Sequence, residues 1–200
     1  MKLIEDMANK EGKHVFKNNW WKAHGVEVIR QPLPVGDYIL VTDKVEDVLK
    51  RKAARGIEPH KMDFLGAVHV SVDTKQSMTE IEGNIVGAAH ERFRDECILA
   101  QNCGIKLYVL VENEDGIKCL DDVAKWQNPR AKRWYRLKAL HEQNKALKIP
   151  IPSRPPVNGE RLMKAMKTMQ EKYGVTFAFC APHEAGQRVL DILTKGKNDV

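Results

Sequence analysis

The stretch AVHVSVDTK (67–75) decides the fold class of this 200-residue chain. Side chains alternate in a β-strand, so the three valines and Thr74 should share one face. The opposite face would carry the polar residues His69, Ser71, Asp73 and Lys75. We expect the valine face to pack into a core and the polar face to open onto a cleft.

The sequence after this strand predicts a long helix and a second strand. Ser77 and Glu80 have the S-x-x-E spacing that starts a helix. An apolar stripe then recurs every four residues and includes Ile81, Ile85, Ala89, Phe93 and Cys97. Residues 102–104 end the helix, and IKLYVLVE (105–112) is a short apolar run typical of a buried strand. Strand, helix and strand in this order favour a partly parallel sheet.

The flanking segments extend the same pattern. Residues 2–5 predict a first strand, and Trp20 and Trp21 lie near the end of a helix. Residues 26–33 and 37–42 predict two strands that form a hairpin, followed by a helix over 44–55. Residues 159–174, 175–180 and 183–195 predict helix, strand and helix. The fold class is therefore α/β, with a mixed central sheet flanked by helices, in a single domain spanning 1–200.

Residues 113–158 form a basic insertion in this plan, with one or two helices. The net charge of the chain is +6, yet residues 125–154 contain nine lysines and arginines against Glu142 as the single acid. This segment therefore carries +8 and the rest of the chain −2. Such a local patch favours a polyanionic partner such as DNA. The alternative is a solvated charged face with Trp126, Trp134 and Tyr135 as core residues of the insertion.

The composition excludes several other classes of protein. No apolar run approaches the roughly 18 residues that span a membrane, and the start of the chain has no apolar leader segment. The four cysteines show no CxxC spacing, which argues against zinc and favours reduced thiols in the cytoplasm.

Asp73 and Lys75 are two residues apart on one strand face, the core of a D-x-K metal-nuclease arrangement. Phosphodiester cleavage builds negative charge at phosphate, which a hard cation and an ammonium group both offset. Mg²⁺ binds through one or two carboxylates plus water and phosphate. The same spacing is also common on solvated strand faces. A second carboxylate could come from Asp37, Asp6 or Glu80, whose ordinary roles would be turn, helix-start and capping acids.

Several motifs, in their order along the chain, resemble the XPF-type structure-specific nuclease domain of the PD-(D/E)XK superfamily. LPVGDYIL (33–40) is similar to the family's Gly-Asp-aromatic motif, and VSVDTKQSMTEI (70–81) occupies the place of its Glu-Arg-Lys motif. ERFRDECILAQNCGIKLYVLVE (91–112) resembles its Arg-Phe helix and following strand. LIED (3–6) resembles its first strand, and residues 159–180 with 183–193 its last helix, strand and helix.

The resemblance implies a restriction-endonuclease-like fold and a metal-dependent DNA endonuclease. Asp37 and Asp73 would bind Mg²⁺ or Mn²⁺, Lys75 would be the catalytic lysine and Asp6 a further catalytic acid. The substrate would be branched DNA, such as a flap, fork or four-way junction, during repair, recombination or replication. Residues expected to contact DNA are Arg92, Lys125, Arg130, Lys132, Arg133, Trp134 and Arg136.

The sequence departs from the family pattern in the site itself. Asp73 replaces the usual glutamate, Thr74 replaces the arginine, and Thr79 stands where an acid is expected. The alternative function is a non-catalytic DNA-junction-binding subunit of the same fold. The resemblance further implies a homodimer, and a short stand-alone version of this domain in the cytoplasm of a bacterial or phage-infected cell.

Overall fold

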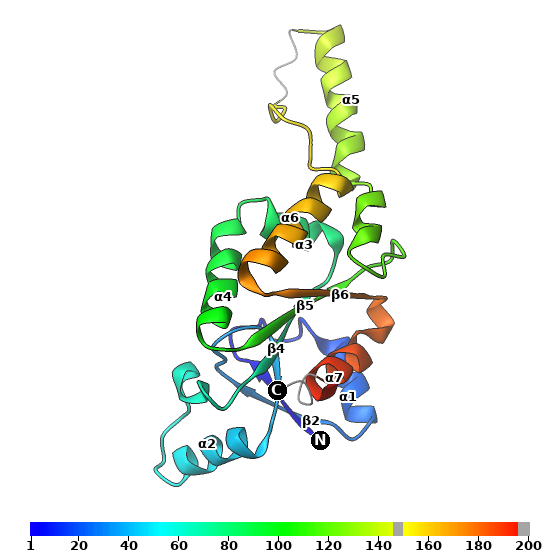
Figure 1. The fold of residues 1–200 in the computed structure, drawn as a ribbon. Coiled ribbons are helices and arrows are strands. Elements are labelled where there is room, and N and C mark those ends of the chain that lie inside the picture. Colours follow the sequence, from blue (N-terminus) through cyan, green and yellow to red (C-terminus); the bar gives the residue numbers. More distant parts are fainter. Residues whose placement is uncertain (146–149, 196–200) are drawn as a thin grey trace.

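The structure, a computed structural model, describes residues 1–145 and 150–195. A six-stranded sheet runs through its centre in the order β2-β1-β3-β4-β5-β6 (Figure 1). The strands are β1 (Lys2–Asp6), β2 (Glu27–Gln31), β3 (Tyr38–Leu40), β4 (Val70–Lys75), β5 (Lys106–Glu112) and β6 (Thr176–Cys180). The α/β class with a mixed sheet is confirmed.

The sheet is parallel at both ends and antiparallel in the middle. Strands β4, β5 and β6 run parallel to one another, and β1 runs parallel to β2. Strand β3 is antiparallel to both of its neighbours, β1 and β4. The predicted hairpin of residues 26–33 and 37–42 is therefore wrong, because β1 lies between the two strands. The apolar pair Leu3 and Ile4 is fully buried at that central position.

Helices cover both faces of the sheet. Helix α1 (Val15–Ala23) and helix α7 (Ala185–Lys195) lie on one face (Figure 1). The other face is covered by α3 (Met78–Ile85), α4 (His90–Asn102) and α6 (Gly159–Tyr173), whose apolar residues share a core with those of β5 and β6. Helix α2 (Asp43–Ala53) and a 3₁₀ turn, η1 (Lys61–Phe64), follow β3, and another, η3 (Pro182–Glu184), precedes α7.

Two separate cores result from this arrangement. The larger contains Ile39, Val109 and Phe93 with the apolar residues of α3, α4 and α6. The smaller contains Val70 and Val72 of β4 with residues of α1 and α7. The valine face of β4 is thus in a core as predicted. The expected open cleft on its other face is wrong, because all six residues of β4 are buried.

The predicted helix after β4 is interrupted. Its chain turns between Ile85 and His90, where α3 ends and α4 begins. Gly87 lies so close to Gly83 that a Cβ on Gly87 would be 2.7 Å from the Gly83 carbonyl oxygen. Two glycines four residues apart weaken a helix and here permit a tight turn. The apolar stripe continues across this break in Ile81, Ile85 and Phe93.

The segment after β5 has two parts. Residues 113–128 pack against the larger core through Val123 and Trp126 and include the 3₁₀ turn η2 (Asp121–Lys125). Helix α5 (Pro129–Gln143) then stands away from the body of the molecule (Figure 1). We call residues 129–145 and 150–157 the arm. Lys148 of the predicted basic patch lies outside the described residues.

Candidate active site

A tight turn before β3 places Asp37 beside the middle of β4. Gly36 has a φ of +71°, and a Cβ there would be 2.3 Å from Ser71 Oγ, so only glycine fits. The next residue, Asp37, donates its backbone N–H to the Val72 carbonyl at 2.8 Å. The Gly-Asp pair therefore follows from the close approach of this turn to β4.

The carboxylate of Asp37 is fixed by Thr74. Its Oδ2 atom accepts hydrogen bonds from the Thr74 backbone N–H at 2.8 Å and from the Thr74 Oγ1 hydroxyl at 2.6 Å. Both residues are buried. Thr74, which departs from the family motif, thus holds one carboxylate oxygen of Asp37 in place and leaves Oδ1 available for another partner.

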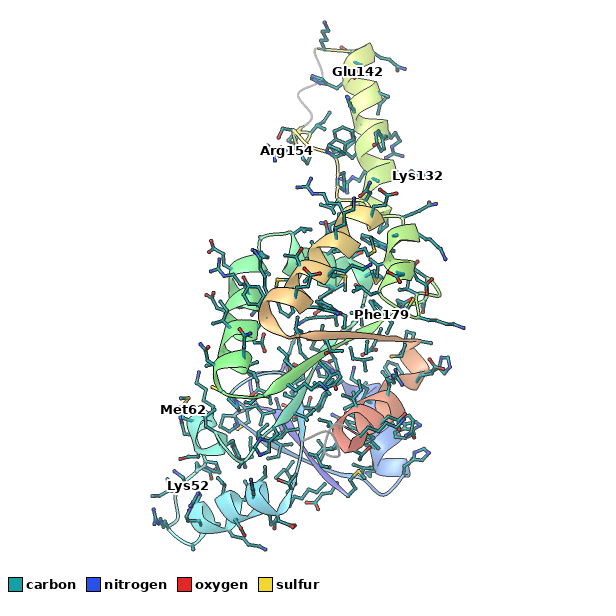
Figure 2. All side chains as sticks on the ribbon, in the orientation of Figure 1. Lys52, Met62, Lys132, Glu142, Arg154 and Phe179 are labelled. Atoms are coloured by element: carbon teal, nitrogen blue, oxygen red, sulfur yellow. The ribbon has the colours of Figure 1, made fainter. Side chains whose placement is uncertain are left out.

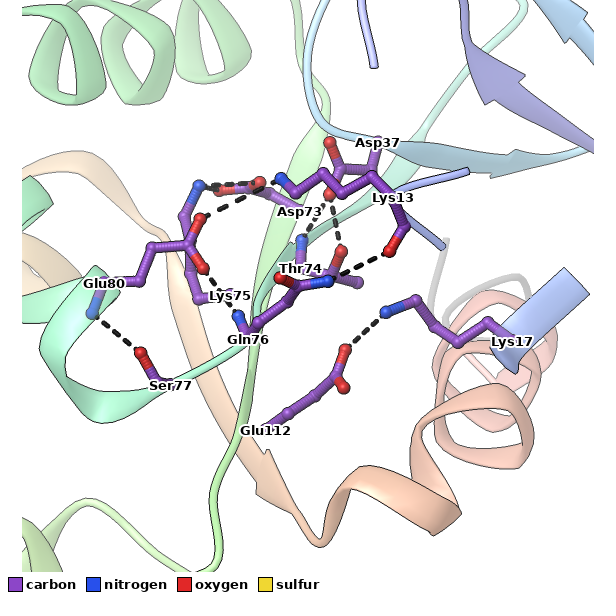
Figure 3. A network of polar contacts seen from close by, with 10 residues as sticks. All are labelled: Lys13, Lys17, Asp37, Asp73, Thr74, Lys75, Gln76, Ser77, Glu80 and Glu112. Atoms are coloured by element: carbon purple, nitrogen blue, oxygen red, sulfur yellow. Dashed lines mark hydrogen bonds and ion pairs between the residues drawn. The ribbon is translucent and has the colours of Figure 1, made fainter. Parts of the chain in front are cut away.

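Asp73 and Lys75 form a buried ion pair on the same strand (Figure 3). The Lys75 Nζ atom lies 2.9 Å from Asp73 Oδ1 and 2.7 Å from Oδ2. Only the contact with Oδ1 has hydrogen-bond geometry, so Oδ2 accepts no hydrogen bond from the described residues. The Lys75 ammonium also lies 5.5 Å from the centre of the Phe93 ring, a favourable cation–π distance.

The charges of this cluster alter its protonation. Burial is the main cause that raises the pKa of Asp73; the carboxylates of Asp37 and Glu96 act with it, and the ion pair with Lys75 acts against it. Burial lowers the pKa of Lys75, but the charges of Asp73, Asp37 and Glu96 outweigh burial and leave it raised. Lys75 is therefore a cation, and the acidic cluster has a surplus of negative charge that a cation would stabilise.

Glu96 on α4 is a third acid of this cluster that the sequence patterns did not indicate. Its Oε1 atom accepts a hydrogen bond from the Gly36 backbone N–H at 2.9 Å, so it buttresses the turn that carries Asp37. A signal was present in the sequence, because Glu96 lies three residues after the buried Phe93 and hence near the inward face of its helix. Its neighbour Asp95 points to solvent instead.

The donor atoms fit a hard divalent cation. Asp37 and Asp73 offer carboxylate oxygens, the ligands that Mg²⁺ and Mn²⁺ prefer. The Oδ2 atom of Asp73 is buried and accepts no hydrogen bond from the part of the chain that the structure describes, and a bound metal ion would share this oxygen with the Lys75 ammonium 2.7 Å away. Within the described ranges, no group of three or more His, Cys, Asp or Glu side chains is arranged to hold a metal by itself. The remaining ligands of a bound ion would be water and substrate phosphate.

The other predicted acids have clear structural partners. Asp6 accepts a hydrogen bond from the Leu33 backbone N–H on Oδ1 at 3.0 Å and donates its own N–H to the Asp37 carbonyl at 2.8 Å. It therefore lies next to Asp37 and holds the loop before β3. Glu80 accepts from the Gln76 backbone N–H at 2.7 Å, while Ser77 caps the start of α3 at 3.1 Å. Glu80 thus supports the helix start.

The candidate DNA-binding residues fall on two elements. Arg92 is exposed on α4, beside the buried Phe93. The others lie on the arm or just before it, and Lys132 is labelled on the arm in Figure 2. The exposed members of this second group are Lys125, Arg130, Lys132, Arg133 and Arg136.

The residues of this second group differ in whether they contact other side chains or the backbone. Arg130 pairs with Glu82 of α3, and Lys125 pairs with Asp122 at 3.3 Å. Trp134 is only 8% exposed and donates its indole N–H to the Pro152 carbonyl at 2.8 Å. This position favours the alternative interpretation of Trp134 as a packing residue of the arm. Tyr135 beside it is 60% exposed.

Comparison with known families identifies the fold and the domain. The model of the ERCC4 domain matches residues 9–193. The chain belongs to the ERCC4 domain family. The XPF protein from Aeropyrum pernix, solved in complex with DNA, is similar in structure, with a TM-score of 0.51 at 15% sequence identity. The match covers 99% of this chain and 66% of the XPF chain, so this chain spans just under two-thirds of that protein's length. The comparison with curated proteins found no match.

Membership of the ERCC4 family confirms the predicted XPF-type nuclease domain and its fold. The buried Asp37–Asp73–Lys75 cluster lies in the motifs that carry the resemblance. Within the described part of the chain, no helix is both long and apolar enough to cross a membrane.

Proposed function

We propose that this ERCC4 domain is a divalent-metal-dependent endonuclease that cuts branched DNA. One observation carries the proposal: the turn before β3 and the end of β4 bring Asp37, Asp73 and Lys75 into a single buried cluster whose carboxylate oxygens suit Mg²⁺ or Mn²⁺. The DNA-bound XPF structure of the same fold supports DNA as the substrate class.

Each side chain of the cluster would have a separate role in hydrolysis. When bound, the metal ion would lower the pKa of a coordinated water and offset charge on the phosphate. Asp37 and Asp73 would hold the ion, with Thr74 keeping the Asp37 carboxylate in one orientation. Lys75 would direct its ammonium toward the attacking water or the developing charge on the scissile phosphate. Asp6 and Glu96 would fix the loop and turn that carry Asp37.

The arm would supply sequence-independent affinity. Lysines and arginines that neutralise phosphates release counterions, which favours binding at low salt. Lys132, Arg133 and Arg136 are exposed and form no ion pair with any side chain of the described ranges. These three are the arm cations most available to DNA. Arg92 on α4 would add a contact on the body, and Lys125 and Arg130 contacts at the base of the arm.

The test is cleavage of labelled flap, fork and four-way junction DNA, with linear duplex as the comparison substrate. We expect cutting of branched DNA with Mg²⁺ or Mn²⁺ and none with EDTA. Asp73→Ala should lose activity by about 100-fold or more, because it removes a metal ligand and leaves Lys75 unpaired. Asp95→Ala, which removes an exposed acid of α4, is the matched control.

Two results would overturn parts of the proposal. Equal cutting by wild type and Asp73→Ala would remove the assigned site. Binding of branched DNA without cutting under any divalent metal would favour the non-catalytic subunit. We also propose that two copies act together on a four-way junction, which has two symmetric strands to cut. Light scattering of the chain with and without junction DNA tests for this homodimer.

A further inference from the structure

A cavity of about 260 Å³ opens beside the end of β4. Gln76, which directly follows Lys75, lines it together with residues of α1 and the end of β5. Figure 3 shows four of its residues, Lys13, Lys17, Gln76 and Glu112, gathered around this strand end. The cavity therefore adjoins the proposed site of phosphodiester cleavage.

The inner wall of the cavity is polar, buried and close to neutral in charge. Lys17 and Glu112 form an ion pair in which the side chains are 5% and 9% exposed. His14 is 2% exposed, and neither ring nitrogen has a hydrogen-bond partner. Leaving two buried nitrogens without partners is costly, so a ligand that supplies hydrogen bonds would stabilise this wall.

The rim of the cavity is exposed and carries an aromatic side chain. Phe16 is 87% exposed at the start of α1, which is unusual for a side chain of its size and apolarity. Lys13 and His183 are also exposed at the rim. Gln76 donates its side-chain amide to the Lys13 carbonyl at 3.1 Å and so holds this rim against β4. An aromatic face beside a lysine is a combination that binds single-stranded nucleic acid.

We propose that this cavity receives one unpaired base of the DNA substrate, from a nucleotide that flanks the scissile phosphate. This inference rests on the proposed nuclease function. The base would stack on Phe16 and present its edge to His14, while its phosphates lie near Lys13. A neutral imidazole offers one donor and one acceptor, which matches a base edge, whereas a phosphate offers acceptors alone. The carboxylate of Glu112 further disfavours a phosphate at the inner wall.

Such a pocket would give the enzyme a means to recognise branched DNA. A base can enter only after it leaves the stack, and this costs least for a base that is already unpaired. Duplex DNA would therefore reach the metal site without filling the cavity. A flap or fork would fill it and gain the stacking interaction.

The experiment measures binding to a flap substrate in EDTA, where no cutting occurs. Phe16→Ala should raise Kd by about 5- to 160-fold, the range of one base–aromatic stack. Phe16→Trp should restore tight binding. An abasic nucleotide is then moved along the unpaired strand. At one position it should weaken wild-type binding by a similar factor and have no further effect on Phe16→Ala, because both changes remove the same interaction. Ile57→Ala, another exposed apolar residue, is the control and should bind like wild type.

The outcomes separate this inference from the proposed function. If wild type cuts branched DNA but Phe16→Ala binds and cuts as wild type does, the pocket inference fails and the nuclease assignment stands. If abasic positions weaken Phe16→Ala as much as wild type at every site, Phe16 does not stack on a base and the inference is again wrong. If wild type neither binds nor cuts branched DNA, both fail together.

Discussion

Glu96 contributes a carboxylate that no sequence motif indicated. Two substitutions can distinguish the effect of its negative charge from that of its hydrogen bond. Glu96→Ala removes the acceptor of the Gly36 N–H and should reduce cleavage by about 10- to 100-fold, the usual loss when a partner that supports a metal site is removed. Glu96→Gln keeps an acceptor oxygen and should retain most activity. The measurement is initial cleavage rate at saturating Mg²⁺.

Asp95→Ala on the same helix is the control for these variants and should leave the rate unchanged, because Asp95 is exposed and pairs with Arg94. A Glu96→Gln variant as inactive as Glu96→Ala would contradict the supporting role and indicate that Glu96 binds the metal directly.

At Gly36, the close approach of Ser71 and the positive φ together require glycine. Gly36→Ala should be strongly destabilising, since its φ is +71° and its new Cβ would be 2.3 Å from Ser71 Oγ. Gly56 has a φ of +63° with open space around it, so Gly56→Ala should cost only the strain of about 1–2 kcal/mol. Urea denaturation of both variants gives the two free energies of unfolding. Equal losses would show that Ser71 moves aside without cost.

His14 should make the stability of the fold depend on pH. Burial and the charge of Lys17 lower its pKa to about 4, against about 6.5 in an unfolded chain. Between these values the unfolded chain binds a proton that the folded chain does not. Stability should therefore fall as the pH drops from about 6.5 to 4, by at most about 1.4 kcal/mol per pH unit.

His14→Leu removes this titration, so the variant should lose less stability than wild type over the same window. Urea denaturation at several pH values measures the difference. Parallel curves for the two proteins would show that His14 is protonated equally in the folded and unfolded states.

At the scale of elements, α5 carries cations that can be tested as a group. Replacing Lys132, Arg133 and Arg136 by alanine should weaken DNA binding at all sequences. It should also reduce the slope of log Kd against log salt by about 0.9 for each phosphate that these side chains neutralise in the wild-type complex. The control replaces Lys44, Lys50 and Arg51, which are exposed on α2 and give the same change in charge. An equal loss of affinity in both triple variants would indicate an effect of net charge alone.

Helices and strands with strong local sequence signals could be predicted from the sequence. The order in which strands pair in the sheet could not. Ser77 caps α3 as its spacing predicted, and the run of apolar residues gave β5 close to its observed bounds. The hairpin prediction failed because local patterns cannot show that β1 inserts between β2 and β3. The break between α3 and α4 depends on Gly83 and Gly87. Both glycines destabilise a helix, but the apolar stripe continues past them and so predicted one unbroken helix.

For the whole molecule, the order of motifs was more informative than any single residue. Strand alternation placed Asp73 and Lys75 together, but only the resemblance brought Asp37 from another strand to join them. Thr74 acquired its role as the partner of Asp37 only in the folded structure. The basic charge predicted for residues 125–154 lies largely on an arm that stands apart from the slightly acidic body (Figure 2). Attraction to phosphate is thereby concentrated at one end of the molecule.

The length of α5 has a consequence for the stretch of DNA that the protein would shield. Its 15 residues extend about 22 Å at 1.5 Å per residue. At about 3.4 Å per base pair, this length corresponds to about six or seven base pairs of duplex. An arm laid along one branch would protect that many additional pairs on one side of the cut. Nuclease footprints of the bound substrate should therefore be asymmetric about the cut. The longer protected side would mark the branch that the arm binds, and the other branch would be the one that is cut.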